Sequence, residues 1–461
     1  MTDFNTLALR PELLETVAAQ GYDTLTPVQA RAIPPILAGA DVRAEAATGS
    51  GKTAAFGLGL LNTLDATQGA WQALVLCPTR ELADQVAQAM RGLAAAIPNV
   101  KLALLCGGAP MRAQASALAQ APHIVVATPG RLLAHLRRGN LDAHALRTVV
   151  LDEADRMLDM GFIDDIRAIL SFLPEPRQTL LFSATWPGDI ERLSGQLQNA
   201  PVEIRVANGA ESAPRISQVF HQVEPRQKMD VLARLLLDPK LDNAAQTLVF
   251  CNKKIDVDAV CADLTRRGFS ALALHGDREQ YERDEVLLRF AQGSAAVLVA
   301  TDVAARGLDI ADLAQVISYD PAANVETHTH RIGRTGRAGR SGRAICLCTP
   351  RETHRAEQIA AHFGFRLAWA RLPTETRTRP TPPPMTTLMI RGGKRDKLRP
   401  GDILGALTGD GGLAGSQVGR IDLTPVRAYV AVARETRGAA LERIKRDGIK
   451  GRRFRVSALD R

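Results

Sequence analysis

Three features are scarce or missing in this sequence of 461 residues, and each argues against a class of protein. The six cysteines contain no C-x-x-C pair, which favours buried free thiols in a reducing compartment over disulfides or a zinc site. No apolar run is long enough to cross a bilayer. Residues 1–20 carry Asp3, Glu12 and Glu15 and no continuous apolar stretch, unlike a secretory leader. We therefore expect a cytoplasmic protein without a membrane partner.

Hydrophobic residues are plentiful, at 46%, and the length corresponds to about three domains with packed cores. Charge is unevenly distributed along the chain. Residues 385–461 contain 17 Lys/Arg against 8 Asp/Glu, whereas residues 1–384 contain 41 of each, so the C-terminal segment holds the entire net charge of +9. A neutral body with a basic appendage predicts that the appendage binds a polyanion, the alternative being a merely solvated basic surface.

Apolar segments of strand length recur in the first 205 residues, at 73–77, 124–127, 148–151 and 179–182, and each runs into a polar motif. Stretches with helical spacing separate them. Strands that are apolar throughout and alternate with helices predict a parallel sheet covered on both faces, with ligands beyond the strand carboxyl ends. The pattern restarts after about residue 205, at 247–250, 296–300 and 344–348, which predicts a second sheet domain.

Residues 46–53 fit the phosphate-binding loop pattern, with Ala46 in place of its first glycine. A Gly-rich loop that leads into a helix points backbone N–H groups at phosphate oxygens. Lys52 would neutralise the β and γ phosphates, and Thr53 would ligate Mg²⁺. The predicted nucleotide-binding residues of this loop are Thr48, Gly49, Ser50, Gly51, Lys52 and Thr53.

An acidic tetrapeptide, Asp152-Glu153-Ala154-Asp155, follows an apolar segment about a hundred residues later. Asp152 would hold the metal from the side opposite Thr53. Glu153 is then placed to orient or deprotonate an attacking water. Either motif alone could be a Gly/Ser-rich loop or a solvated helix start. In this order, each after an apolar segment, they predict an NTP site with Mg²⁺.

The second half of the chain has no phosphate-binding loop, but arginines recur every third residue from Arg331 to Arg340 with glycines among them. Such a loop can bring guanidinium groups close to phosphates. The alternative, a flexible tract that binds RNA without specificity, is disfavoured by the apolar strands on both sides.

Residues 1 to about 370 resemble the DEAD-box ATP-dependent RNA helicases, motif by motif and in the family's order. The match includes Phe4 and the segment at residues 21–29, which is similar to the family's adenine-reading motif. The resemblance implies two tandem RecA-like domains, at residues 1–205 and 206–370, that use ATP. It also implies that Gln29 pairs with the adenine edge and that Phe4 braces the loop. Ala47 departs from the family, which often has Gln there.

The same resemblance implies roles in the second domain. Asp309 would contact the ribose, and Arg334 and Arg337 would act as arginine fingers on the γ-phosphate. Because the fingers and the phosphate-binding loop lie on different sheets, hydrolysis would require the two domains to close. The polar network that senses closure would consist of Asp155, Ser183, Thr185 and His330.

RNA would lie across both domains and be clamped so that a short duplex comes apart locally. Contacts to the sugar-phosphate backbone carry no base information, so the core should tolerate any sequence. The residues that the resemblance places near RNA are Arg80, Gly108, Thr128, Arg131 and Thr301, with Arg306 bridging the RNA and ATP sides.

The remainder divides into a Pro-rich linker at residues 371–384 and a small domain at residues 385–461. Its predicted order of strands and helices, βαββαβ with the last strand at residues 454–456, fits an RRM-like α+β fold. Residues 391–394 and 401–409 resemble the RNA-binding domain that follows the helicase core in one bacterial group of this family. That similarity implies binding to a hairpin of large-subunit ribosomal RNA during 50S ribosome assembly, with a pre-ribosomal particle as partner.

The small domain lacks the full aromatic set that RRM sheets use to stack bases, since Met389 occupies one such position. We therefore expect a basic rim to hold folded RNA by shape. Its members are Lys394, Arg395, Lys397, Arg399, Lys450, Arg452, Arg453 and Arg455. The alternatives are a general RNA helicase or RNA chaperone without ribosomal specificity, a non-catalytic ATP-gated RNA clamp, and a DNA translocase. We expect a monomer.

Overall fold

The computed structural model describes residues 3–46, 49–186, 188–206, 216–239, 241, 246–305, 313–336, 341–374 and 376–459. The chain separates into two compact units, one with the described residues up to 206 and one with those from 216 onward. None of the helices in this described part is both long and apolar enough to span a membrane. Of the six cysteines, all but the half-buried Cys261 are buried.

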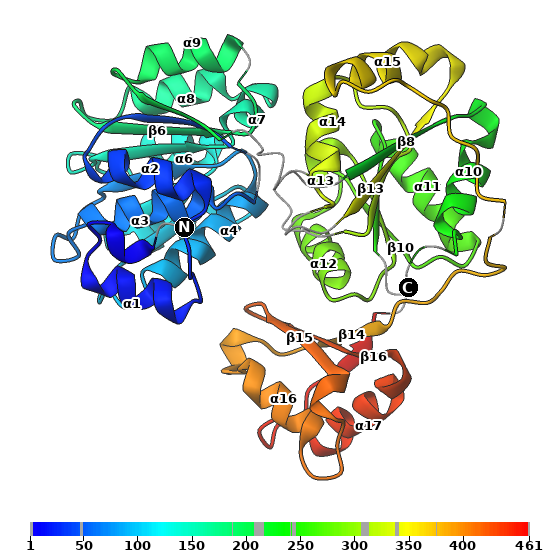
Figure 1. Cartoon of the computed structure of the whole chain (residues 1–461). Coiled ribbons are helices and arrows are strands. Elements are labelled where there is room, and N and C mark those ends of the chain that lie inside the picture. Colours follow the sequence, from blue (N-terminus) through cyan, green and yellow to red (C-terminus); the bar gives the residue numbers. More distant parts are fainter. Residues whose placement is uncertain are drawn as a thin grey trace. The chain divides into compact units, whose positions relative to one another are not determined.

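The first unit is a seven-stranded parallel sheet with helices on both faces (Figure 1). The strands are β1 (Val42–Glu45), β2 (Ala73–Leu76), β3 (Leu102–Leu105), β4 (Ile124–Ala127), β5 (Thr148–Asp152), β6 (Gln178–Ser183) and β7 (Val202–Arg205). The helices are α1 (Pro11–Ala19), α2 (Pro27–Leu37), α3 (Lys52–Thr63), α4 (Arg80–Leu93), α5 (Met111–Leu118), α6 (Pro129–Leu136), α7 (Ala154–Asp159), α8 (Ile163–Leu170) and α9 (Gly188–Leu197), after a 3₁₀ turn at Phe4–Thr6.

Strand β2 shows why the strands are apolar at every position. Ala73 and Val75 belong to one hydrophobic core, and Leu74 and Leu76 belong to another on the opposite face. Successive strand residues point to opposite faces, so a sheet covered on both sides needs apolar residues throughout. The prediction of a doubly covered parallel sheet is confirmed.

The order of the strands, β3-β4-β2-β5-β6-β1-β7, decides which motifs are neighbours. The loops after β3, β4 and β2 carry the predicted RNA contacts of this unit. The acidic tetrapeptide begins at the last residue of β5, Ser183 is the last residue of β6, and the phosphate-binding loop follows β1. The predicted RNA contacts therefore lie on one half of the carboxyl edge, which we call the RNA half, and the predicted nucleotide-binding residues lie on the other half, with β2 and β5 adjacent at the boundary.

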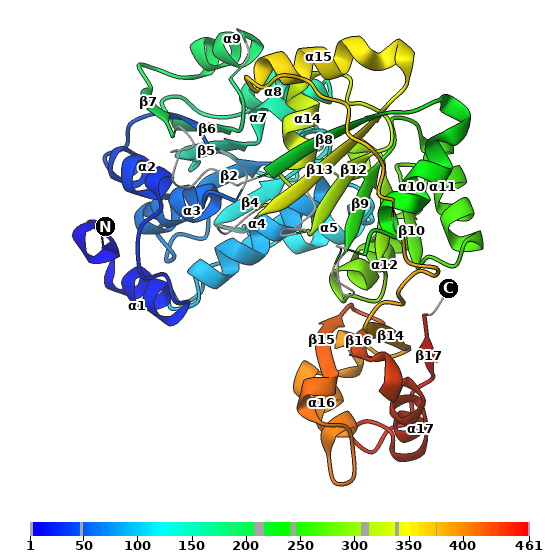
Figure 2. The same ribbon diagram turned by 45° about the vertical axis from the view of Figure 1, so that its right-hand side comes forward.

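The second unit begins with another parallel sheet, of order β10-β11-β9-β12-β13-β8 (Figure 2). Its strands are β8 (Ile216–Gln222), β9 (Thr247–Phe250), β10 (Ala271–Leu274), β11 (Val297–Ala300), β12 (Gln315–Ser318) and β13 (Gly342–Cys348). Its helices are α10 (Lys228–Leu236), α11 (Lys254–Arg266), α12 (Gln280–Ala291), α13 (Asp302–Ala305), α14 (Val325–Ile332) and α15 (Thr353–His362), with 3₁₀ turns at Pro225–Gln227 and Pro350–Glu352.

The C-terminal part of this unit is a four-stranded antiparallel sheet with two helices, which we call the tail domain. It contains β14 (Met385–Ile390), α16 (Pro400–Thr408), β15 (Val418–Leu423), β16 (Ala428–Ala433), α17 (Arg437–Asp447) and β17 (Val456–Ala458), with 3₁₀ turns at Lys394–Asp396, Gly415–Gln417 and Arg434–Thr436. The predicted βαββαβ order is confirmed. The last strand begins at Val456, two residues later than predicted, and Phe454 packs against the core ahead of it.

The helix-free face of the tail sheet contacts the end of α12. The amide nitrogen of Gln292 donates to the Asp422 carboxylate at 2.9 Å, and its amide oxygen accepts from the Thr387 hydroxyl at 2.8 Å. The hydroxyls of Ser294 and Thr387 lie 2.7 Å apart, and the Thr387 side chain is fully buried. This contact occupies the face with which RRM sheets usually stack bases.

Candidate active site

The phosphate-binding loop joins β1 to α3 in the first unit, where Gly51 precedes the helix with a φ of 94° that favours glycine. Lys52, the first helical residue, is buried, and its Nζ donates to the Ala46 carbonyl at 3.0 Å. Gly49, Ser50 and Thr53 lie in the same turn, whereas Thr48 lies outside the described residues. The helix N-terminus therefore presents N–H groups and a lysine at one point.

Gln29 contacts the phosphate-binding loop directly. Thr26 caps helix α2 and forms a reciprocal capping box with Gln29, which fixes the Gln29 side chain. The amide nitrogen of Gln29 then donates to the Gly51 carbonyl at 3.3 Å. Phe4 is buried, with its ring 6.1 Å from that of Tyr22 in the predicted adenine segment. The residues predicted to read adenine thus adjoin the loop predicted to hold phosphates.

The acidic tetrapeptide begins at the end of β5, where Asp152 is buried and its Oδ1 has no hydrogen-bond partner within the described part of the chain. Burial raises the pKa of the Asp152 carboxyl to about 6, although Lys52 opposes that shift. Glu153 adopts a left-handed backbone with a φ of 54° and pairs with Arg156 at 2.5 Å. A strained non-glycine residue beside a buried carboxylate is typical of a functional site.

Asp155 links the tetrapeptide to the end of β6. Its backbone N–H donates to the Ser183 hydroxyl at 3.3 Å, and its carboxylate accepts from the Thr185 hydroxyl at 2.9 Å and the Thr185 N–H at 3.0 Å. The structure therefore brings together three of the four residues predicted to sense closure. The fourth, His330, lies on α14 in the second unit.

The RNA half of the edge is formed by the starts of α4 and α6 and by the loop after β3. Arg80 begins α4, and its guanidinium lies so close to Gly107 that a Cβ on the glycine would stand 2.7 Å from Nη2. Gly108 has a φ of 86°, and Thr128 precedes α6 as its N-cap residue. Arg131 lies one turn into α6 and donates from Nη1 to the Ala109 carbonyl at 2.8 Å. These four predicted RNA contacts are therefore neighbours.

In the second unit, Thr301 follows β11 and Arg334 follows α14. The backbone N–H of Arg334 donates to the Arg331 carbonyl, which closes a turn at the end of the helix. Three other predicted residues, Arg306, Asp309 and Arg337, lie outside the described residues.

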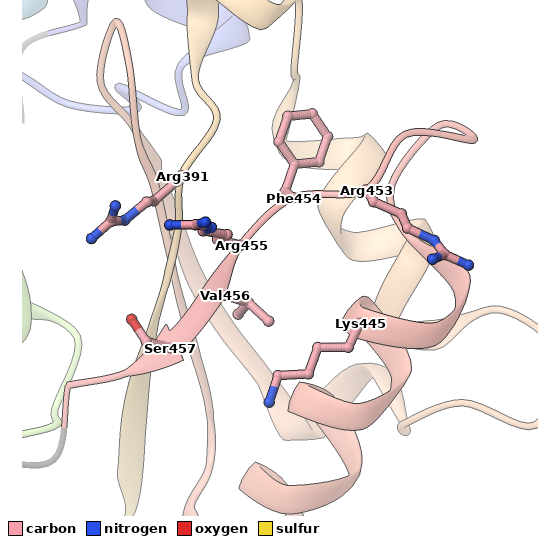
Figure 3. Close-up of a pocket in the computed structure, with 7 residues that line it drawn as sticks. All are labelled: Arg391, Lys445, Arg453, Phe454, Arg455, Val456 and Ser457. Atoms are coloured by element: carbon pink, nitrogen blue, oxygen red, sulfur yellow. The ribbon is translucent and has the colours of Figure 1, made fainter.

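The tail domain has a pocket of about 500 Å³ beside β17 (Figure 3). Four cations line it, together with Phe454, Val456 and Ser457: Arg391, Lys445, Arg453 and Arg455. Two of these, Arg453 and Arg455, were predicted as RNA contacts. Lys450 instead pairs with Asp402 at 2.9 Å, and Arg452 lies over the Phe454 ring. The other predicted cations, Lys394, Arg395, Lys397 and Arg399, lie at the start of α16 and before it.

Family models match all three parts of the chain. The DEAD/DEAH box helicase model covers residues 26–193, the helicase conserved C-terminal domain model covers 227–339, and the DbpA RNA binding domain model covers 387–458. The ATP-dependent RNA helicase DbpA of Escherichia coli (strain K12) is 52% identical over 460 residues, 100% of both chains. The chain belongs to the DEAD-box RNA helicases.

Other members of the family are similar over the core. The DEAD-box ATP-dependent RNA helicase CshA of Geobacillus kaustophilus (strain HTA426) is 43% identical over 359 residues, 78% of this chain and 76% of its own. Among solved structures, S. cerevisiae Dbp5 bound to RNA and ADP BeF3 superposes with a TM-score of 0.71 at 29% identity, covering 81% of this chain and 96% of that one. As a DEAD-box helicase, the chain binds RNA, is an RNA-stimulated ATPase and unwinds RNA with ATP.

Arg331 is a structural residue of this DEAD-box helicase that sequence reasoning missed. Its side chain is fully buried and forms a bidentate pair with Asp302, at 2.7 and 2.8 Å. It also donates to the Asn252 side chain at 2.7 Å and the Asp320 carbonyl at 2.6 Å. Arg331 thereby ties α14 to the ends of β9, β11 and β12 and fixes the start of the turn that carries Arg334. Nothing in its sequence spacing distinguishes it from the arginines that follow.

Proposed function

We propose that this helicase hydrolyses ATP with Glu153 as the base or water-orienting group, Lys52 on the phosphates, and Arg334 and Arg337 as fingers. The observation that supports the nucleotide half is the convergence of Gln29, the phosphate-binding loop and the acidic tetrapeptide at one sheet edge. Asp155, Ser183 and Thr185, with His330, would couple nucleotide to RNA. The division at residues 205, 370 and 384 is likewise proposed.

Mg²⁺ is the metal that these residues fit. Two oxygens are available as hard ligands: the Thr53 hydroxyl at the start of α3 and the buried Oδ1 of Asp152, which has no partner in the described part of the chain. Mg²⁺ prefers such oxygens together with water and substrate phosphates. We propose that Thr53 and Asp152 hold the ion, partly through water. The ion would neutralise charge on the phosphates during transfer. Asp152 must be ionised for this, and a bound cation favours that state despite burial.

We propose further that the tail domain directs the helicase to a hairpin of large-subunit ribosomal RNA during 50S assembly, in the cytoplasm and as a monomer. The observation that carries this proposal is the pocket with four cations, in a domain that matches the DbpA RNA-binding model. Because α12 contacts the helix-free sheet face, the basic edge is the better candidate for binding RNA. The four guanidinium and ammonium groups around this pocket can bind several RNA phosphates at once.

Replacing both Arg453 and Arg455 with alanine should weaken hairpin binding about tenfold or more. Log affinity decreases linearly with log salt, and the steepness of that decrease should be smaller by about 0.7–0.9 for every phosphate that the variant no longer neutralises. Fluorescence anisotropy at several salt concentrations, with the hairpin fragment and a version with a scrambled loop, measures both quantities.

The matched control removes two cations outside the pocket, Arg420 and Arg446, which are exposed and paired with Asp422 and Asp447. We expect a smaller decrease in affinity for this variant. Equal decreases in the two double variants would show that the pocket has no special role. Equal affinity of the unaltered chain for both RNAs would favour the general RNA helicase without ribosomal specificity.

A further inference from the structure

A buried polar network lies behind the RNA half of the first unit's sheet edge, and no sequence motif marks it. Its centre is Gln114 on α5, which is 9% exposed. The amide nitrogen of Gln114 donates to the Cys106 carbonyl at 2.9 Å, just before Gly107 and Gly108. Its amide oxygen accepts from Arg131 Nη1 at 2.9 Å. One side chain therefore connects two segments predicted to contact RNA.

His135 fixes the orientation of this amide. It is fully buried on α6, one turn after Arg131, and its Nε2 lies 3.0 Å from the Gln114 amide oxygen. An amide oxygen can only accept, so Nε2 carries the proton and Nδ1 accepts from the Asn140 amide at 3.0 Å. Burial lowers the pKa of His135, in keeping with this neutral form. Reversing the Gln114 amide would break three of these hydrogen bonds at once.

The network ends on a cation that keeps donors available. Arg131 uses only Nη1 for its two bonds, to Gln114 and the Ala109 carbonyl. In the described part of the chain, Nε and Nη2 of Arg131 make no hydrogen bond. The network thus holds the half-buried guanidinium by one nitrogen and leaves the others to water or an anion, and such a planar fork of donors suits phosphate recognition.

We infer that Gln114 and His135 are positioning residues that hold the Arg131 guanidinium in place for the RNA backbone. This inference rests on the proposed RNA contact of Arg131. Neither residue touches RNA. They act by holding the Arg131 side chain in one conformation before RNA binds. The binding step then does not include the free-energy cost of immobilising that side chain.

Gln114→Glu gives a test that a merely structural role would not pass. The carboxylate keeps the size of the amide and still accepts from Arg131, but it pairs the guanidinium with a full negative charge and can no longer donate to the Cys106 carbonyl. We expect the RNA concentration for half-maximal ATPase stimulation to rise, and its salt slope to fall by about 0.7, the value for one phosphate of a single strand that is no longer neutralised. Arg131→Ala should show the same two changes. The probe is oligouridylate, with the full chain and saturating ATP.

The double variant makes the test specific. If Gln114 acts only through Arg131, adding Gln114→Glu to Arg131→Ala changes neither the half-maximal RNA concentration nor the slope further. With saturating RNA, the ATP KM of Gln114→Glu should stay near that of the unaltered chain. Gln120→Glu is the matched control, because it adds the same charge near the same sheet, where the Gln120 side chain accepts from the exposed Lys101. It should leave the salt slope unchanged.

Two kinds of result would overturn the inference. One kind leaves the proposed RNA contact of Arg131 intact, and the other contradicts that contact as well. If Arg131→Ala alters RNA dependence but Gln114→Glu does not, the network is structural. If their effects add, Gln114 does not act through Arg131, and the loss of its bond to the Cys106 carbonyl beside Gly108 is the remaining route. If Arg131→Ala has no effect, the proposed RNA contact itself is wrong. Should Gln114→Glu fail to fold, Gln114→Leu, which cannot accept a hydrogen bond, should raise the half-maximal RNA concentration about 2- to 10-fold, and an unchanged value would contradict the inference.

Discussion

Replacing Glu153 with glutamine is expected to lower ATP turnover about 10²- to 10⁴-fold, the usual contribution of a positioned general base. The amide cannot take a proton from water. It can still accept from Arg156, the buried partner of Glu153, so the fold should persist. ATP and RNA should still bind, because Lys52, Gln29 and the RNA half are untouched. Steady-state ATPase assays and binding of a fluorescent ATP analogue measure the two effects separately.

The lifetime of the complex with ATP and single-stranded RNA is the control measurement for Glu153→Gln. While turnover is lowered to that extent, an ATP-dependent complex with single-stranded RNA should persist longer than in the unaltered chain, because hydrolysis is what reopens the clamp. Failure of Glu153→Gln to bind nucleotide would contradict the assigned role. Persistent turnover within a few-fold of normal would favour a different base.

Arg334→Ala should lower the RNA-stimulated rate by about 10³- to 10⁵-fold, the range for removal of an arginine finger. The reason is that the finger would add a cation from the second unit to Lys52 and the metal ion, and so stabilise the charge that develops on the γ-phosphate in the transition state. ATP binding should change little, since the phosphate-binding loop belongs to the first unit. Single-turnover ATPase measurements with saturating RNA check the rate without interference from product release.

Arg334→Lys is the matched variant for the finger, because it keeps the charge but not the planar fork. It should recover only part of the rate. Because Arg334 is itself buried, the thermal midpoint of both variants is measured beside the rate, so that lost catalysis is separated from lost stability. Replacement of Arg331 should lower the midpoint, because breaking its pair with Asp302 costs about 3–5 kcal/mol. Full activity of Arg334→Ala would remove the finger assignment.

The sequence predicted the parallel-sheet domains because a strand that is covered on both faces needs apolar residues throughout. Strands β2, β4 and β5 are examples, since they are buried at every position. It could not predict the strand order, because pairing is set by packing of distant segments. That order is what places Arg80 and Arg131 on one half of the edge and Lys52 and Asp152 on the other.

Residues of the site could be predicted where they belong to a sequence motif. They could not be predicted where only the packing of distant segments brings them together. Glu153 stands in a motif, but Gln114 and His135 are ordinary residues on helix faces that become a network only when α5 and α6 meet. Arg331 and Arg334 look alike in the sequence, yet Arg331 pairs with Asp302 and, fully buried, joins α14 to the ends of three strands of the second sheet. The pocket of the tail domain joins Arg391 to Lys445, which only folding brings together.

Unwinding rates on two matched duplexes test the central claim, that the tail domain directs an ATP-driven helicase. Both substrates carry the same short RNA duplex, joined in one to the ribosomal hairpin and in the other to a hairpin with a scrambled loop. With ATP and substoichiometric enzyme, the account predicts faster unwinding beside the ribosomal hairpin, and equal rates for both once Arg453 and Arg455 are replaced by alanine. Equal rates for the unaltered chain would contradict it.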